Sequence, residues 1–238
     1  MLAPTLLALT FATGVIDAIS YLAIGSVFTA NMTGNLVLVG FALGGQPGFS
    51  ISRTLVSLLA FMLGAAIAGR LAFSWYERPF IWMQRVTRIE LVLVLLAAAL
   101  ATNIHTGVET GDSPVRYLVV IVLAIAMGMR NATVRRLGFR DIPTTVATST
   151  ISDLATESHL GGGERRNELR RIGAIACMLA GAAAGAALVR EVSTLAAFSL
   201  AIAAVGAAVA HQAWVAHRHP APARAVADPP APPTPPEA

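Results

Sequence analysis

Charged residues are scarce in this chain, and their scarcity indicates its class. Only 13% of the 238 residues are charged and 55% are hydrophobic, and the mean hydropathy is +0.67. Soluble domains carry roughly twice this share of charge, about 25%. The composition therefore excludes an ordinary soluble domain and indicates an all-α polytopic membrane protein embedded in a lipid bilayer.

Lysine is absent, and cysteine is nearly so. All 17 basic residues are arginine, which together with the richness in Ala, Gly and Pro indicates a GC-rich bacterial genome. Arg-rich loops in a membrane protein act as topology determinants, so the net charge of +4 does not predict a nucleic-acid partner. The single cysteine, Cys177, excludes an intrachain disulfide.

Enzyme signatures are missing as well. The sequence contains no H-E-x-x-H, G-x-S-x-G or Walker motif, and no Cys/His cluster with metal-ligand spacing. We therefore expect no enzymatic activity, no catalytic residue, no metal site and no cofactor.

Six apolar stretches are long enough, or nearly so, to cross a membrane core, which needs about 20 helical residues. They are residues 2–24, 52–73, 89–106, 115–129, 172–189 and 194–215. Two shorter segments, residues 28–43 and 142–154, carry most of the polar residues expected at membrane depth. The first stretch lacks a basic leader and a cleavage site, so we expect a retained helix. The Pro-rich residues 217–238 are predicted to form a disordered tail.

The arginines favour a topology in which the two short segments are re-entrant and only the six long ones cross. One side then receives Arg70, Arg78, Arg85, Arg88, Arg130, Arg135, Arg136, Arg140, Arg165, Arg166, Arg170, Arg171, Arg218 and Arg224. The other side keeps Arg53, Arg116 and Arg190. Fourteen against three obeys the positive-inside rule, whereas eight against nine results if both short segments span. We therefore predict that both termini are cytoplasmic.

The same topology predicts an inverted 3+3 repeat, with residues 1–107 and 108–216 as the two membrane repeats. Each repeat has three crossings, and an odd number makes the second repeat start from the opposite face. Two small-residue helices support the match, because residues 62–66 read M-L-G-A-A and residues 179–183 read L-A-G-A-A. Such faces allow close helix approach. The alternative is that Ala and Gly are simply frequent in helices from a GC-rich genome.

Polar residues recur at matching places in the two repeats. In each, an apolar helix is expected to end at a polar residue followed by Ala, namely Asp17-Ala18 and Asn131-Ala132, and a segment dense in Thr, Ser and Asn follows. Non-helical backbone at membrane depth is tolerated where it is enclosed by protein or lines a cavity. We predict a substrate or ion pathway formed by Asp17, Asn31, Thr33, Gly34, Asn35, Asn131, Asp141, Thr144, Thr148, Ser149, Thr150 and Asp153.

Two structural interpretations compete with this pathway. Asp17 is the candidate for proton or cation coupling, since a charge at membrane depth costs about 2.5–3.5 kcal/mol and normally has a function, but it is equally suited to capping backbone or steadying the next segment. Similarly, Thr33 or Asn35 is a candidate N-cap. Arg130 is interpreted as a topology signal and Glu90 as an interfacial residue.

Two stretches resemble the signature stretches of the YoaK family of bacterial inner-membrane proteins. They are G-V-I-D-A-I-S-Y-L-A-I-G-S-V-F-T-A-N-M-T-G-N-L-V-L-V-G and R-L-G-F-R-D-I-P-T-T-V-A-T-S-T-I-S-D-L-A. The resemblance implies a polytopic protein of the bacterial inner membrane and supplies no activity. The family often has Thr-Gly where this chain has Thr148-Ser149.

Together these features predict a small secondary transporter or channel for an unidentified small solute or ion. A unit of 3+3 crossings is small for alternating access, which is compatible with a homodimer. The alternative is a membrane scaffold or envelope sensor that transports nothing and uses its polar segments only for helix packing.

The arginine distribution makes the topology testable. Reporters fused after Ala238 and inserted at Gly162 should both report the cytoplasm, and one at Gly111 should report the outside. A result that places Gly162 and Ala238 on opposite faces contradicts both the topology and the inverted repeat.

Overall fold

The computed structural model describes residues 2–73, 79–103, 113–138, 147–156 and 168–218, and all regular structure in these ranges is helical. The elements are α1 (Ala3–Ile19), the π-helix η1 (Ser20–Gly25), α2 (Met32–Leu43), α3 (Ile51–Phe73), α4 (Pro79–Ala101), α5 (Pro114–Arg136), α6 (Ala147–Thr156), α7 (Glu168–Glu191) and α8 (Thr194–Arg218). Asp141 and Thr144 lie outside the described residues, as does the predicted tail beyond Arg218.

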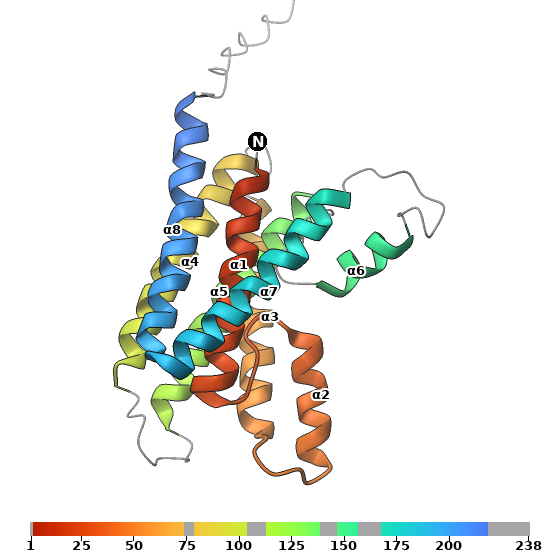
Figure 1. The fold of residues 1–238 in the computed structure, drawn as a ribbon, viewed down its shortest axis with the longest axis vertical. Helices are drawn as coiled ribbons and strands as arrows, with labels where there is room; N and C mark the ends of the chain where they lie inside the picture. The colour runs from red at the N-terminus through yellow and green to blue at the C-terminus, as the bar shows by residue number, and fades with distance from the viewer. Residues whose placement is uncertain (1, 74–78, 104–112, 139–146, 157–167, 219–238) are drawn as a thin grey trace, which may run out of the picture.

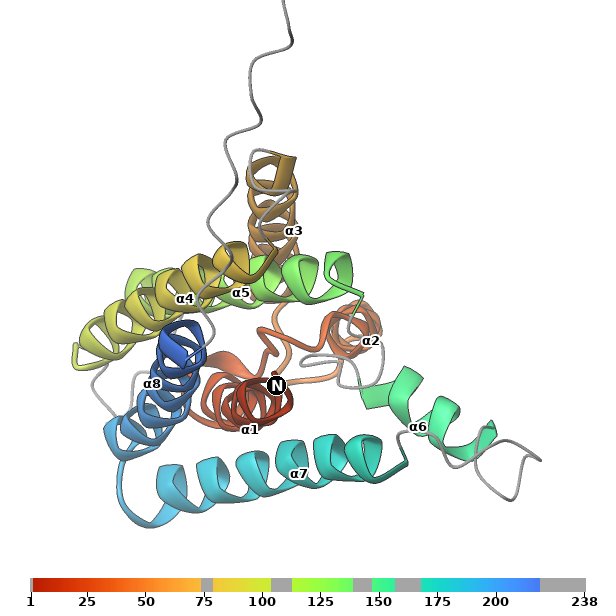
Figure 2. The same cartoon turned by 90° about the horizontal axis from the view of Figure 1, so that it is seen from above.

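Helix α1 lies near the centre of the bundle (Figure 2). It packs along α7 and against α8, while α5 packs along α3 and against α4, and α4 contacts α8. Helix α2 packs on α3, and α6 packs on α7. These two short helices lie on one side of the bundle but toward opposite ends (Figure 1). The N-terminus lies at the same end of the bundle as the C-terminal end of α8.

Five of the described helical segments are long and apolar enough to cross a membrane. They are Ala3–Gly25, Ile51–Ala72, Pro114–Arg136, Glu168–Glu191 and Thr194–Arg218. The sixth predicted crossing, residues 89–106, falls in the second half of α4, whose first half carries arginines and Glu90. Apolar side chains such as Leu59, Leu63 and Leu179 are exposed, as expected for a bundle surrounded by lipid.

Two helices continue past the polar residues at which they were predicted to end. Helix α1 runs through Asp17 and is prolonged by η1, and α5 runs through Asn131 to Arg136 instead of stopping at Met129. The prediction of helix ends at Asp17 and Asn131 was wrong. Packing against neighbouring helices, rather than the polarity of one residue, sets where these helices end.

After η1 the chain turns back toward the middle of the bundle. Ser26 takes a left-handed conformation with a φ of 54°, which is uncommon for a non-glycine residue, and ends the π-helix. Residues 26–31 are not helical, and α2 then runs back toward the same end of the bundle (Figure 1). The N-cap of α2 is Asn31, whose Oδ1 accepts a hydrogen bond from the Gly34 N–H at 3.1 Å, and not Thr33 or Asn35.

Glycines set the close approach of α1 and α7. A Cβ added to Gly14 would overlap the backbone of Met178, and a Cβ added to Gly181 would overlap the backbone of Phe11. Each helix thus uses a glycine to admit the backbone of the other.

The pair α5 and α3 is built in the same way. A Cβ added to Gly128 would overlap the backbone of Phe61, and a Cβ added to Gly64 would overlap the backbone of Ile125. Small residues at these positions let two backbones meet, which replaces the hydrophobic driving force that lipid does not supply.

Helix α3 contains a matched pair of glycines that tests this packing. Gly64→Ala should lower the free energy of unfolding by about 1–3 kcal/mol, because the backbone of Ile125 cannot make room for the new methyl group. Gly69→Ala should be neutral or stabilising by up to about 1 kcal/mol, since nothing lies within 4 Å of its Cβ position. Thermal unfolding of the purified variants in detergent measures both, and equal responses would contradict the close packing of α3 and α5.

Candidate functional site

Asp17 anchors the non-helical segment that follows η1. Its Oδ1 accepts hydrogen bonds from the backbone N–H of Thr29 at 3.0 Å and of Ala30 at 2.9 Å, and from the Thr29 hydroxyl at 3.5 Å. Asp17 lies eight residues before Gly25, so at 1.5 Å per residue the chain has returned about 12 Å along α1 when it reaches this contact.

Asn35 and Ser57 bind the backbone groups of Phe28, the residue before Thr29. Asn35 Oδ1 accepts from the Phe28 N–H at 2.9 Å, and its Nδ2 donates to the Phe28 carbonyl at 2.7 Å and to Ser57 Oγ at 3.2 Å. Ser57 Oγ donates to the same Phe28 carbonyl at 2.6 Å. Both side chains are fully buried. The backbone groups freed by the helix break are therefore satisfied by side chains of α1, α2 and α3, which is what an apolar interior requires.

A buried ion pair contacts the turns of α1 that precede Asp17. Arg130 Nη1 donates to Glu90 Oε1 at 2.7 Å, and the two side chains are only 2% and 1% exposed. The same Nη1 donates to the Leu9 carbonyl at 3.0 Å, and Nη2 donates to Thr13 Oγ1. Thr13 lies one helical turn before Asp17, so the ion pair and the anchored segment meet on neighbouring turns of α1.

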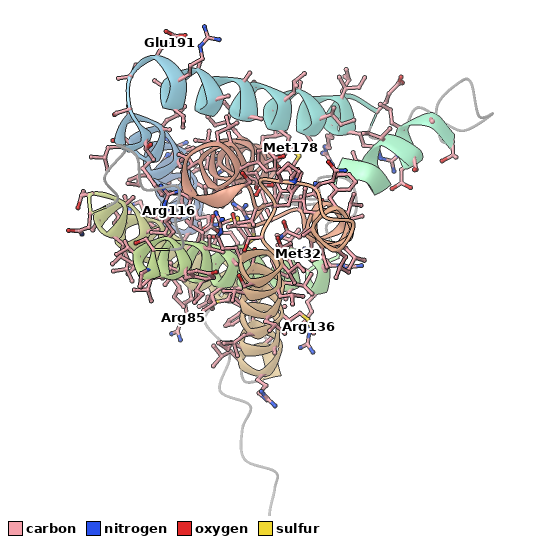
Figure 3. The ribbon with its side chains drawn as sticks, turned by 90° about the horizontal axis from the view of Figure 1, so that it is seen from below. Met32, Arg85, Arg116, Arg136, Met178 and Glu191 are labelled. Atoms are coloured by element: carbon pink, nitrogen blue, oxygen red, sulfur yellow. The ribbon has the colours of Figure 1, made fainter. Side chains whose placement is uncertain are left out.

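The structure corrects two assignments made from the sequence. Arg130 is not a topology signal and Glu90 is not interfacial, because both are buried and paired with each other. Arg85 and Arg136, on the same two helices, do point away from the bundle (Figure 3). The missed signal is helical phase: Glu90 follows Thr87 by three residues on the buried face of α4, whereas Arg88 lies on the exposed face.

Buried polar side chains continue from the ion pair toward the end of the bundle that holds the N-terminus. Gln212 Nε2 of α8 donates to Thr87 Oγ1 at 3.1 Å, and Gln84 Nε2 donates to the Gln212 carbonyl at 3.0 Å. Thr5 of α1 bonds His211 Nδ1 at 2.8 Å. A polar seam thus runs between α1, α4 and α8 in an otherwise apolar interior.

The predicted pathway residues of the first repeat are only partly brought together. Asp17 and Asn35 are buried on the two sides of the helix break, whereas Asn31 and Thr33 are exposed and Gly34 is half-buried at the start of α2. Asn131 is half-buried in α5.

Apart from Asn131 on α5, the predicted pathway residues between 108 and 216 lie on α6 or outside the described residues. Thr150 is buried, and the backbone carbonyl of Asp153 accepts a hydrogen bond from Arg171 Nη1 at 3.1 Å. The side chains of Thr148 and Ser149 lie outside the described part. The predicted approach of the first polar segment to Thr144, Thr148 and Ser149 therefore stays a prediction.

These features define the class, which is an all-helical membrane protein. Its helices are long and apolar, apolar side chains are exposed on its outer surface, and a polar seam is buried inside. The chain belongs to the family described as "Protein of unknown function (DUF1275)", whose model matches residues 5–211. It is similar to the UPF0700 transmembrane protein YoaK of Bacillus subtilis (strain 168), with 34% identity over 151 residues that cover 63% of this chain and 64% of that relative. No solved structure matches the chain. The resemblance to the YoaK family is thereby confirmed.

The buried ion pair can be tested with two arginines of α5, of which Arg130 is buried and Arg135 is exposed. Arg130→Leu should lower the free energy of unfolding by about 3–5 kcal/mol, because it leaves Glu90 buried without its partner. Arg135→Leu removes the same charge from an exposed position and should change stability by about 0.5 kcal/mol or less. In a Glu90→Gln background the loss caused by Arg130→Leu should shrink, since no unpaired charge remains. Chemical or thermal unfolding in detergent measures all four proteins, and a similar loss for both arginines would contradict the pairing.

Proposed function

We propose that this protein is a small secondary transporter or channel for a small solute or ion, located in the bacterial inner membrane with both termini in the cytoplasm. The observation that carries the proposal is the helix break at residues 26–31, held inside the bundle next to the buried pair of Glu90 and Arg130. Broken helices and ionisable groups at membrane depth are costly, and transporters use both at their binding sites.

The packing supports two inverted repeats. Helices α1 and α5 correspond through Gly14 and Gly128, and each packs by that glycine on the second long helix of the other repeat. They are also antiparallel, because Arg116 near the start of α5 bonds the carbonyl of Ile24 after α1, whereas Arg130 bonds the carbonyl of Leu9. Antiparallel first helices are the arrangement that an inverted repeat requires, and a parallel repeat would not produce it.

In this proposal the solute or ion passes close to Asp17 and Asn35 in the first repeat and to the polar stretch around Thr150 in the second. A homodimer would give the small unit a scaffold against which one part can move.

Uptake into proteoliposomes tests transport directly. Purified protein is reconstituted and offered a panel of inorganic ions and small metabolites, with and without a pH gradient, beside protein-free liposomes. Uptake of at least one compound is expected, and Asp17→Asn should reduce it while the protein still inserts and folds. If Asp17 serves only to cap backbone, the variant should lose stability and keep its transport per folded molecule. A correctly inserted protein that moves none of the compounds would favour the scaffold or sensor alternative.

Water access to the helix break is a second prediction of the proposal. In a Cys177→Ala background, single cysteines at Asn31 and Thr33 should react with a membrane-impermeant thiol reagent added from outside. Cysteines at Leu36 and Val37, which are exposed on the apolar face of α2, should react at least tenfold more slowly because lipid covers them. Equal inertness at all four positions would contradict a water-filled approach to the break.

A further inference from the structure

Three ionisable groups are buried around α1, and their charges do not cancel. Asp17 and Glu90 supply two carboxylates, and Arg130 supplies one guanidinium, which lies within electrostatic reach of both. Arg171, the other buried arginine among the described residues, lies at the contact between α6 and α7, where it bonds the carbonyl of Asp153. With both carboxylates ionised, the trio therefore has a charge of −1, and one bound proton makes it neutral.

The two carboxylates are held differently. Asp17 accepts two backbone N–H groups and a hydroxyl, donors that stabilise a carboxylate anion. Glu90 has one oxygen on Arg130, while its Oε2 is buried with no hydrogen-bond partner. A charged carboxylate oxygen without a hydrogen-bond partner raises the free energy of an apolar interior, and protonation of that oxygen removes the penalty. Oε2 can take that proton without disturbing the bond between Oε1 and Arg130.

We infer that Glu90, and not Asp17 as expected from the sequence, is the group that binds and releases the coupling proton, while Asp17 stays ionised, anchors the helix break and lines the proposed pathway. This deepens the proposed transport function, and rests on it, by naming the ion and the residue that carries it. On binding, Oε2 gains a proton from water and the trio changes from −1 to neutral. On release, the O–H bond breaks, the proton returns to water, and Arg130 keeps its bond to Oε1. A trio without net charge costs far less than one with a net charge of −1 in an interior that excludes water.

The surroundings of Glu90 offer one proton route among the described residues. In the part of the chain that the structure describes, Arg130 of α5 is the charged group that contacts it, and Asp17 of α1 lies within electrostatic reach of that guanidinium. His211 of α8 bonds Thr5 of α1, and Arg85 and Arg88 of the helix that carries Glu90 are exposed. The polar seam formed by Thr87, Gln212 and the Thr5–His211 pair leads from Glu90 toward the N-terminal end of the bundle. Gln212 Oε1 is buried with no partner in this seam, so it can accept a hydrogen bond from a proton carrier.

Infrared difference spectroscopy of the full-length protein in lipid reads this proton directly. Spectra are compared between about pH 8 and pH 6, where exposed glutamates, which titrate near 4.3, stay ionised. We expect a carbonyl band of a protonated carboxylic acid at the lower pH. The band should shift when glutamate is labelled with ¹³C and not when aspartate is labelled. It should be lost in Glu90→Gln. In Asp17→Asn it should appear only at a lower pH, because the remaining pair of Glu90 and Arg130 is neutral without the proton.

Several results would overturn the inference: no such band, a band that follows the aspartate label, or a band that survives Glu90→Gln. If Glu90→Gln does not fold, isotope labelling of the unaltered protein still separates glutamate from aspartate. The test is independent of transport. A Glu90 band in a protein that moves no solute would refute the proposed function alone, whereas transport without the band would refute the proton site alone.

Discussion

Peptide groups inside a membrane must find their hydrogen bonds within the protein, and the architecture around α1 follows from that constraint. A helix satisfies its own backbone, but residues 26–31 leave the helix and so need partners from elsewhere. Asp17, Asn35 and Ser57 provide those partners from three different helices. The break therefore depends on tertiary contacts: without Asp17 or Asn35, the N–H groups of Thr29 and Ala30 or of Phe28 lose these partners.

The charged core imposes a second constraint on the same helices. Arg130 joins α5 to α4 through Glu90 and to α1 through Thr13 and the carbonyl of Leu9. A guanidinium has five donors in a fixed plane, so these partners fix its orientation as well as its position. The bonds of Arg130 thereby fix how α1, α4 and α5 are rotated relative to one another, which apolar contacts alone would leave less determined.

The all-helical membrane class could be predicted from the sequence, because the length of the apolar runs reflects the membrane directly. The six crossings, the topology drawn from the arginines and the inverted repeat stay predictions. Gly64 and Gly181, which belong to the two small-residue stretches matched in the sequence, do each admit the backbone of a neighbouring helix. The site was harder to predict. Glu90 and Arg130 lie near charged neighbours in the sequence, and whether such a residue is buried depends on the phase of its helix against helices far along the chain. No single-helix pattern contains that information.

Each half of the chain packs mainly against the other half, and this determines when the fold can form during synthesis. Helix α1 packs along α7, and α3 packs along α5, so the closest contacts of each half are with the other half. When the first half has entered the membrane, the glycine faces of α1 and α3 are still without the backbones that fill them. The ribosome must deliver more than half of the chain before either close pair can form. Assembly is thus late and stepwise, because α3 can pair once α5 has been made, whereas α1 must wait for α7. Until then, surfaces of the first half that the finished protein buries are without their partners.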